Sequence, residues 1–432
     1  MKTLNGRKAG LAKVQPTSVL GTIAVVGLSL GSAMTVAQQP PAAASPQTPQ
    51  VYSGAAPGAN GQRRGIVADP MHPIMPIGTS APDFNLKGVD DKMHTLGEYS
   101  KAKVLVIVFE SDHCPVSENY ESRIRAINND YKDKGVMLVA INPNNPSAVR
   151  LNELGYTDLT DSFADMKLRV ANRHMTWPFL YDGETQALAT KFGASATPHI
   201  FIFDQDRKLR YEGRIDDNQT QALVKSRDAR NALDALLAGQ EIPVTHTPAF
   251  GCSTKWLSKS GDVEAEMEKI KAEPVTLDAA APADLKKLVA NGTSKITVVH
   301  FWATNDKDSA AIFHDLQTTY RMYRLRDFNL VTVATNHPEQ KDEVMKFLQA
   351  QYASSTNYQV DTKNLKGVQD AVGAKWKAGE SFTMVIAPDG KVLYQKEGKF
   401  DIHEMRRAVL ANMPDGRAYA GQHAYWSERE GN

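Results

Sequence analysis

One order of secondary structure occurs twice in this chain, and it constrains the fold more than any other feature. In the first block, apolar runs at residues 104–109 and 136–141 predict strands, and helical patterns at residues 116–134 and 161–173 follow them. The block closes with a predicted hairpin and helix, at residues 199–203, 209–211 and 219–237. Alternating strands and helices followed by a hairpin predict a mixed sheet flanked by helices.

The second block repeats this order without repeating the residues. Strands are predicted at 296–302 and 328–333 and helices at 309–325 and 340–351, followed by a hairpin and helix at 382–386, 392–394 and 402–410. Such internal similarity predicts two tandem α/β domains. We expect the first domain at 71–256, a charged helical connector at 257–274, the second domain at 275–413 and a polar tail at 414–432.

The N-terminal region has the layout of an export signal. Residues 1–13 carry Lys and Arg but no acid, residues 18–37 are uncharged and largely apolar, and small residues precede Gln38. We therefore predict export with cleavage after Ala37, the alternative being an uncleaved membrane anchor. Residues 38–70, rich in Pro, Ala, Gln and Gly, predict a disordered linker that would tether the folded part.

Composition excludes several classes of function. The 432 residues include 50 Lys and Arg against 49 Asp and Glu, so no overall charge favours a nucleic-acid partner. With 2 cysteines, the chain has neither a disulfide-dense scaffold nor a four-cysteine metal cluster. Cys114 and Cys252 allow one disulfide at most, in the oxidising compartment that export predicts.

Five stretches between residues 77 and 256 carry a family resemblance. They read GTSAPDFNL at 78–86, FESDHCPV at 109–116, Thr197-Pro198, GRIDD at 213–217 and GCSTKW at 251–256. Together they resemble exported redoxins of the alkyl hydroperoxide reductase and thiol-specific antioxidant type. The resemblance implies a thioredoxin-like fold, so we predict two tandem thioredoxin-like domains, each with a mixed central sheet.

The resemblance also implies roles for residues around Cys114. This cysteine opens a helix where thioredoxin-like proteins place Cys-x-x-Cys, with Ser111 at the first of the two positions. Ser111-x-x-Cys114 also matches the Thr/Ser-x-x-Cys spacing of peroxiredoxins. Those enzymes place a proline seven positions before the cysteine, where this chain has Ile107. Thr197-Pro198 stands where the fold places its cis-proline, which packs against the reactive cysteine.

Physical chemistry gives Cys114 a reason to react. A thiol in the first turn of a helix lies near unpaired N–H groups and the positive end of the helix dipole, which favour the thiolate. His113 is expected to assist when protonated, and Ser111 to donate a hydrogen bond to the sulfur. The alternative is a buried, inert cysteine that only packs.

Two further positions of the first block are candidate site residues. Cys252 follows the last helix in a segment able to fold back over the site, where it would resolve an oxidised Cys114 by thiolate exchange. The alternatives for this pair are a static disulfide or two unrelated thiols. Arg214, with Asp216 and Asp217, is expected either to orient a thiolate or substrate carboxylate or to form a solvated salt-bridge cluster.

The second block has lost the corresponding chemistry. Residues 301–304 (FWAT) resemble the start of the active-site motif of membrane-side thioredoxins, but Asp306 and Ser309 stand at the two cysteine positions and Ser381 at the cis-proline position. Without its thiols the domain cannot exchange disulfides. We expect Asp306, Asp308 and Ser309 to cap a helix and the domain to bind partners.

The sequence thus predicts an exported, thiol-dependent oxidoreductase that reduces a peroxide or a disulfide through Cys114, without a cofactor or metal. Its partners would be a thiol or disulfide protein, or a peroxide with a thiol reductant. The competing hypothesis is a binding or scaffold protein without enzymatic activity. A weaker alternative is copper handling, for which Met71, His72 and Met75 supply suitable ligand types.

Overall fold

The computed structural model describes residues 70–377 and 379–413, so the expected export signal, most of the linker and the tail lie outside the described residues. Within these two ranges, no helix combines the length and the apolar character needed to cross a membrane.

The first sheet is mixed, as the sequence predicts. Its strand order is β2-β1-β5-β4-β3-β7-β8. The central strand β3 (Val104–Phe109) runs parallel to β4 (Val136–Asn142) and antiparallel to β7 (His199–Phe203), which forms the hairpin with β8 (Leu209–Gly213). The short strands at the other edge are β1 (Asn85–Gly88), β2 (Met93–Thr95) and β5 (Phe179–Tyr181).

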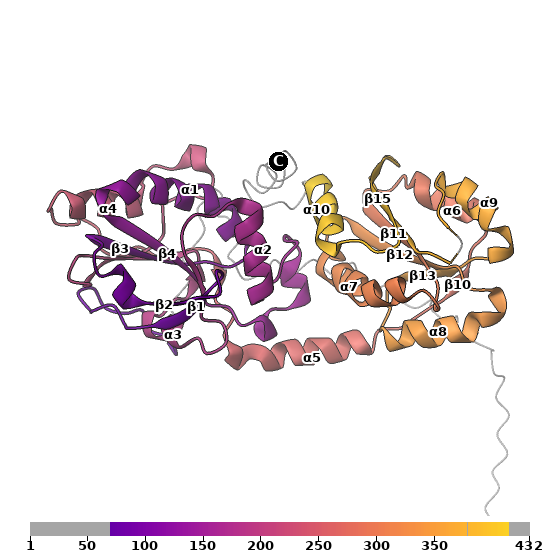
Figure 1. The fold of residues 1–432 in the computed structure, drawn as a ribbon, viewed down its shortest axis with the longest axis horizontal. Coiled ribbons are helices and arrows are strands. Elements are labelled where there is room, and N and C mark those ends of the chain that lie inside the picture. The colour runs from indigo at the N-terminus through magenta and orange to yellow at the C-terminus, as the bar shows by residue number, and fades with distance from the viewer. Residues whose placement is uncertain (1–69, 378, 414–432) are drawn as a thin grey trace, which may run out of the picture. The chain divides into compact units, whose positions relative to one another are not determined.

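Helices cover both faces of this sheet (Figure 1). Val104, Val106 and Val108 pack in one core with α1 (Pro115–Tyr131) and α4 (Asp228–Leu237). The intervening β3 residues pack in a second core with α3 (Ala187–Phe192) on the opposite face. Because all six β3 side chains are buried, the strand is a continuous apolar run, which explains why the sequence predicts it so well.

The second sheet repeats the central arrangement of the first. Its order is β10-β13-β12-β11-β14-β15, and the strands from β13 to β15 have the same relative directions as β5-β4-β3-β7-β8. The strand bounds are β10 (Asp278–Ala279), β11 (Ile296–Trp302), β12 (Phe328–Ala334), β13 (Thr356–Gln359), β14 (Phe382–Ile386) and β15 (Val392–Glu397). The predicted repeat of element order is therefore present in the structure.

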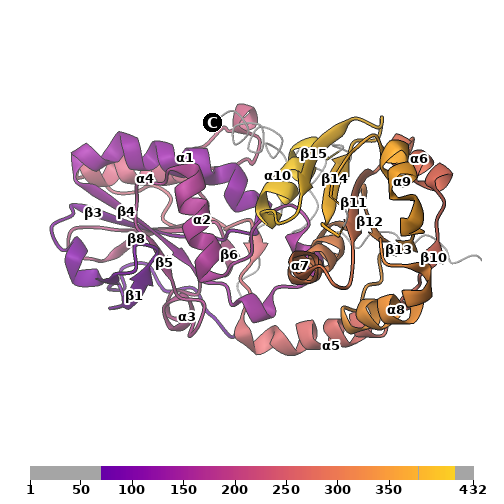
Figure 2. The same cartoon turned by 45° about the vertical axis from the view of Figure 1, so that its right-hand side comes forward.

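Helices also lie on both faces of the second sheet, as Figure 2 shows from a second angle. One face packs against α7 (Lys307–Tyr323) and α10 (Ile402–Asn412), and the other against α6 (Pro282–Ala290) and α9 (Leu365–Val372). The remaining helix, α8 (Lys341–Ala350), packs on Trp302 and Phe313. A separate helix, α5 (Ser260–Lys271), falls within the predicted connector.

Two predicted helices begin later than their sequence patterns indicate. The pattern at 219–237 becomes a short 3₁₀ turn (Gln221–Leu223) and α4, because Arg123 of α1 binds the carbonyls of Asn218 and Gln219 and holds this stretch outside the helix. The pattern at 161–173 becomes α2 (Phe163–Arg173), capped by Ser162, so Asp161 lies before the helix.

Candidate active site

Cys114 is the N-cap residue of α1. Its backbone is extended (φ −80°, ψ 113°), Pro115 opens the helix, and the sulfur accepts a hydrogen bond from the Ser117 N–H at 3.4 Å. This geometry follows from the local sequence, since proline fits the first helical position and leaves the preceding residue extended. The Cys114 side chain is 0% exposed. The thiol is thus fixed at the positive end of the helix dipole and shielded from solvent.

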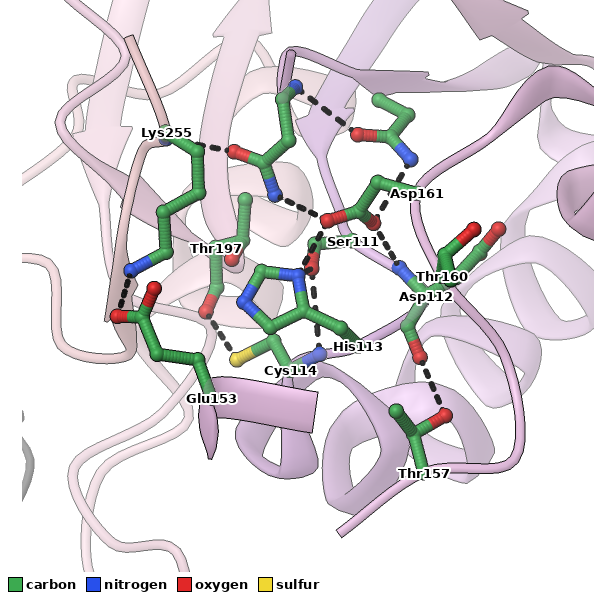
Figure 3. A network of polar contacts seen from close by, with 12 residues as sticks. Ser111, Asp112, His113, Cys114, Glu153, Thr157, Thr160, Asp161, Thr197 and Lys255 are labelled. Carbon is green, nitrogen blue, oxygen red and sulfur yellow. Dashed lines mark hydrogen bonds and ion pairs between the residues drawn. The ribbon is translucent and has the colours of Figure 1, made fainter. Parts of the chain in front are cut away.

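The predicted cis-proline lies beside this thiol. The Thr197–Pro198 bond is cis, and the Thr197 carbonyl oxygen is 3.1 Å from Cys114 Sγ. Figure 3 shows the sulfur pointing at this carbonyl. The structure therefore brings Cys114, Thr197 and Pro198 together, as expected.

Cys252 reaches the same place from the segment after α4. Strand β9 (Cys252–Ser253) pairs antiparallel with β6 (Ala196–Thr197), and its register puts Cys252 opposite Thr197. The Cys252 side chain hydrogen-bonds Cys114, and both cysteines are free thiols. Unlike Cys114, Cys252 is only partly buried.

Gly251 permits this close approach. A Cβ atom built on Gly251 would lie 2.1 Å from the Thr197 carbonyl oxygen, a distance that no side chain tolerates. The segment therefore meets β6 at this position only because residue 251 is glycine. On the same segment, Phe250 packs edge to face against Tyr120 of α1, with ring centroids 5.8 Å apart.

His113 is fixed by a residue that the sequence analysis did not single out. Its Nδ1 contacts the Asp161 carboxylate, and both side chains are buried (Figure 3). Asp161 also accepts hydrogen bonds from the Asp112 N–H at 2.8 Å and from the side-chain amides of Asn142 and Asn144, both at 3.0 Å. These four donors explain how a buried carboxylate is stabilised.

The His113–Asp161 pair favours the charged form of both partners. Burial alone would lower the pKa of His113, but the Asp161 carboxylate raises it above its usual value. Burial would likewise raise the pKa of Asp161, and His113 together with the amide donors lowers it instead. The pair therefore favours the imidazolium form of His113, the residue directly before the reactive thiol in sequence.

Cys114 is consequently acidic. Burial would raise the pKa of its thiol, but the hydrogen bond from Cys252, the charge of His113 and the Ser117 N–H lower it to about 5. A pKa in this range favours the thiolate form of Cys114 at neutral pH. The thiolate character expected from the helix dipole and His113 is therefore supported, and Cys252 adds to it.

Ser111 has a different contact from the one expected. Its hydroxyl accepts a hydrogen bond from the backbone N–H of Cys114 at 3.2 Å and contacts His113 Nδ1 at 3.0 Å. Because Ser111 precedes the N-cap, its side chain meets the backbone of Cys114 rather than the sulfur. It positions the cysteine and the histidine.

Strand register also revises the assumed motif positions. Phe109 pairs with His199, the residue after Pro198, while Phe301 pairs with Phe382, the residue after Ser381. Five residues beyond each phenylalanine lies a helix N-cap, Cys114 in α1 and Asp306 in α7. Cys114 therefore occupies the first position of the Cys-x-x-Cys pattern, not the second, and Ser117 the second.

Arg214 forms a salt bridge with Asp228, and not the expected cluster with Asp216. Its Nε is 2.7 Å from Asp228 at the start of α4, and its N–H donates to Thr247 Oγ1. Asp216 instead binds Arg123 and the Tyr120 hydroxyl. The hydrogen bonds that the structure gives for the Cys114 thiol involve Ser117, Thr197 and Cys252, and not Arg214.

A buried charge network supports the turn before Cys114. The Arg169 guanidinium of α2 donates to the Ser111 carbonyl at 2.8 Å and to Asp112 at 3.1 Å, and lies 3.5 Å from Glu110. Burial raises the pKa of Glu110 to about 7, although Arg169 opposes this. No local sequence pattern reveals the network, because its members come from a strand end, a turn and a distant helix.

His72, one of the residues on which the copper alternative rests, has a ring partner in the structure. Within residues 70–377 and 379–413, no group of three or more His, Cys, Asp or Glu side chains is arranged to hold a metal ion. The His72 ring instead stacks on Trp256 with centroids 3.6 Å apart and planes 6° apart.

The mixed sheet, the N-cap cysteine and the adjacent cis-proline define the first domain as a thioredoxin-like redoxin. Comparison with protein families gives the particular group: residues 77–212, within this domain, match the AhpC/TSA family. The match supports a thiol oxidoreductase. A search of curated proteins found no match.

Three solved structures illustrate the similarity. An uncharacterized conserved protein from Geobacillus kaustophilus is 36% identical, with 42% of this chain and 92% of that one covered and a TM-score of 0.38. A hypothetical protein from Sinorhizobium meliloti 1021 is 30% identical, with 43% and 96% covered and a TM-score of 0.38. Peroxidoxin BcpB from Mycobacterium tuberculosis is 19% identical, with 38% and 95% covered and a TM-score of 0.27.

Proposed function

We propose that this protein is a thiol–disulfide oxidoreductase whose redox couple is Cys114 and Cys252. The observation that carries the proposal is the hydrogen bond between the two thiols, one of which is a buried thiolate at a helix N-terminus. The β6–β9 pairing keeps the sulfurs together, and the two free thiols stand ready for oxidation. Oxidation would join them in a disulfide and deliver two electrons to the acceptor.

Three groups would tune the couple. The Ser117 N–H, the charge of His113 and the thiol of Cys252 all stabilise the Cys114 thiolate. Stabilising the reduced state makes a disulfide a stronger oxidant and makes Cys114 a better leaving group. Ser111 would position the backbone of Cys114, and Thr197 and Pro198 would pack beside its thiol. Arg214 would stabilise the start of α4.

The structure favours a disulfide over a peroxide as the oxidant of this couple. A peroxide would have to reach Cys114, whose side chain is 0% exposed, and Ile107 replaces the proline that peroxiredoxins place before their cysteine. A disulfide can react at the partly exposed Cys252. A peroxidase activity would therefore require the segment around Cys252 to open.

The remaining parts of the chain would serve this reaction. We propose that the N-terminal region exports the protein, or anchors it, in an oxidising compartment where the couple can persist. The second domain, with Asp306 at the thiol position, would bind partners rather than exchange disulfides. The alternative, a scaffold in which Cys114 only packs, requires both thiols to stay reduced in the presence of oxidants.

Mass mapping of the cysteines tests the proposal. One sample of the reduced full-length protein is exposed briefly to oxidised glutathione and a second sample to hydrogen peroxide. Free thiols are then alkylated in both samples before digestion. We expect a Cys114–Cys252 disulfide to appear only after oxidation, and faster with oxidised glutathione than with an equal concentration of peroxide. Two alkylated cysteines after both treatments would refute the oxidoreductase assignment and leave the scaffold.

A further inference from the structure

We infer that Cys252, and not the N-cap residue Cys114, is the thiol that reacts with the external disulfide, and that Cys114 completes the reaction inside the protein. The inference rests on the proposed function and assigns an order to its two sulfurs. It departs from the motif, because the first position of Cys-x-x-Cys, which normally meets the substrate, is filled by Cys114.

Accessibility separates the two thiols. Disulfide exchange requires the attacking sulfur to approach in line with the S–S bond of its substrate, and a side chain with no exposed surface cannot do so. Cys114 is 0% exposed and Cys252 is partly exposed. An external disulfide therefore meets Cys252 first.

The segment at residues 250–255, which carries Cys252 and which we call the cover of Cys114, is fixed to the domain on both sides of Cys252. Before it, Phe250 packs on Tyr120 and Gly251 lies against the Thr197 carbonyl. After it, the Thr254 hydroxyl donates to the Ala194 carbonyl, and the Lys255 ammonium pairs with Glu153 at 2.6 Å. These contacts involve α1, β6 and the loop before α2, so the cover is part of the folded domain.

The resulting reaction balances in two exchanges. Cys252 attacks one sulfur of the external disulfide, the bond between its two sulfurs breaks, and the departing thiolate takes the proton of Cys252. The product is a mixed disulfide at Cys252. Cys114, already a thiolate, then attacks Cys252 Sγ, forms the Cys114–Cys252 bond and releases the second external thiolate. The couple loses two electrons and the external disulfide gains them.

Reduction follows the same path in reverse. An external thiolate attacks Cys252, the partly exposed residue of the protein disulfide, and Cys114 departs as a thiolate. A thiol that leaves as a stable thiolate leaves faster, so the acidity of Cys114 assists this step. A buried, acidic thiol is therefore placed where a leaving group is needed rather than where a substrate must enter.

Single-cysteine variants of the full-length protein test this order. Oxidised glutathione is added to reduced Cys114→Ser and Cys252→Ser, and the rate of mixed-disulfide formation is followed by intact mass at pH 7. We expect the Cys114→Ser protein, which retains Cys252, to react at least about tenfold faster, because Cys252 is the partly exposed cysteine of the two. An equal or faster reaction of the Cys252→Ser protein would overturn the inference.

Two controls keep the result interpretable. Unfolding both variants in urea should bring their rates close together, because denaturation removes the difference in exposure, and melting curves verify that each variant folds. The wild-type mapping experiment separates the two claims. A Cys114–Cys252 disulfide together with a faster reaction at Cys114 rejects only the order, whereas the absence of that disulfide rejects the proposed function itself.

Discussion

The two sheets share a central strand order but place different residues at the same point of it. In the first domain the N-cap after the central strand is Cys114, a thiol with a lowered pKa beside a histidine with a raised pKa. In the second it is Asp306, which caps its helix by accepting the Asp308 N–H at 3.0 Å, as its sequence predicts. The backbone thus supplies a helix N-terminus in both domains, and the side chain at the N-cap decides between chemistry and capping.

The nearby histidines differ in the same way. His113 contacts the Asp161 carboxylate, which raises its pKa. His300 of β11 instead contacts the Thr383 and Ser309 hydroxyls, and burial lowers its pKa to about 3 although Asp306 opposes this. A reactive site therefore needs more than the fold. It needs a carboxylate from the loop before α2 and a second thiol from the segment after α4.

Exchanging the N-cap residues should have the largest effect. Cys114→Asp gives the first domain the residue of the second, and because no second sulfur remains for Cys252, no intramolecular disulfide should form on addition of oxidised glutathione, and the reaction should stop at the mixed disulfide of Cys252. Cys114→Ser should behave alike if the aspartate variant misfolds. The reciprocal variant Asp306→Cys places a thiol at the N-cap of α7, where the third residue of the helix is Ser309 and not a cysteine. We expect no intramolecular disulfide at this position, and finding one would contradict the idea that the fold alone is insufficient for the chemistry.

Removing the charge behind His113 should have the next largest effect. Asp161→Asn takes away the carboxylate that keeps His113 protonated, so the pKa of Cys114 should rise from about 5 by roughly one to three units. The change is measured from the ultraviolet absorbance of the thiolate as a function of pH. Asp161→Asn is compared with its parent both in the two-cysteine protein and in a Cys252→Ser background, where Cys114 is the remaining cysteine. Asp91→Asn, an exposed carboxylate paired with Lys167, is the control and should leave the titration unchanged.

The pH dependence of stability follows with a defined sign. The pKa of Cys114 is lower in the folded protein than in the unfolded chain, so thiolate formation stabilises the reduced fold at high pH. This contribution is lost as the pH falls through about 5. In urea titrations, the free energy of unfolding of wild type relative to Cys114→Ser should therefore rise between pH 5 and pH 8. A flat difference would show that the thiol is not acidic.

Displacing the cover should have a smaller effect. Gly251→Ala places a methyl group against the Thr197 carbonyl and should move Cys252 away from Cys114. We expect disulfide formation to slow by about tenfold, as for other misplacements of reacting groups. Gly261→Ala, where the added Cβ meets no atom within 4 Å, should form the disulfide at the wild-type rate.

The smallest effect on the redox site is expected from the second domain. His300 is buried neutral, so the unfolded chain binds a proton below about pH 6.5 that the folded domain does not, and stability should fall by about 2 kcal/mol from pH 7 to pH 5. His300→Gln should remove this part of the pH dependence, measured as the difference between urea titrations. Its rate of disulfide formation should equal that of wild type, and a change in that rate would mean that the two sites communicate.

Local patterns in the sequence were sufficient for the frame of both domains and for Cys114. The buried strands at 104–109 and 296–302 are unbroken apolar runs, and Cys-Pro before a helical pattern marks an N-cap. The sequence does not predict α3 and β5, because elements of six and three residues are too short to show a hydrophobic period.

The site partners needed tertiary information. Asp161 is far from His113 in sequence, and the sequence pattern includes it in a helix that begins only at Phe163. Its role therefore depends on how the loop before α2 returns to the sheet. The position of Cys114 in the Cys-x-x-Cys pattern likewise depended on strand register, which a sequence spacing does not fix. Arg214 illustrates the converse, because its motif position says nothing about its neighbour Asp228.

The pairing of β9 with β6 also affects how the couple responds to dilution. Cys252 belongs to the same chain as Cys114 and is already ordered beside it, so closure of the disulfide is a unimolecular step. Its effective molarity is set by the domain and not by the amount of protein present. The second half of the reaction should therefore proceed at the same rate in the most dilute compartment as in a concentrated one.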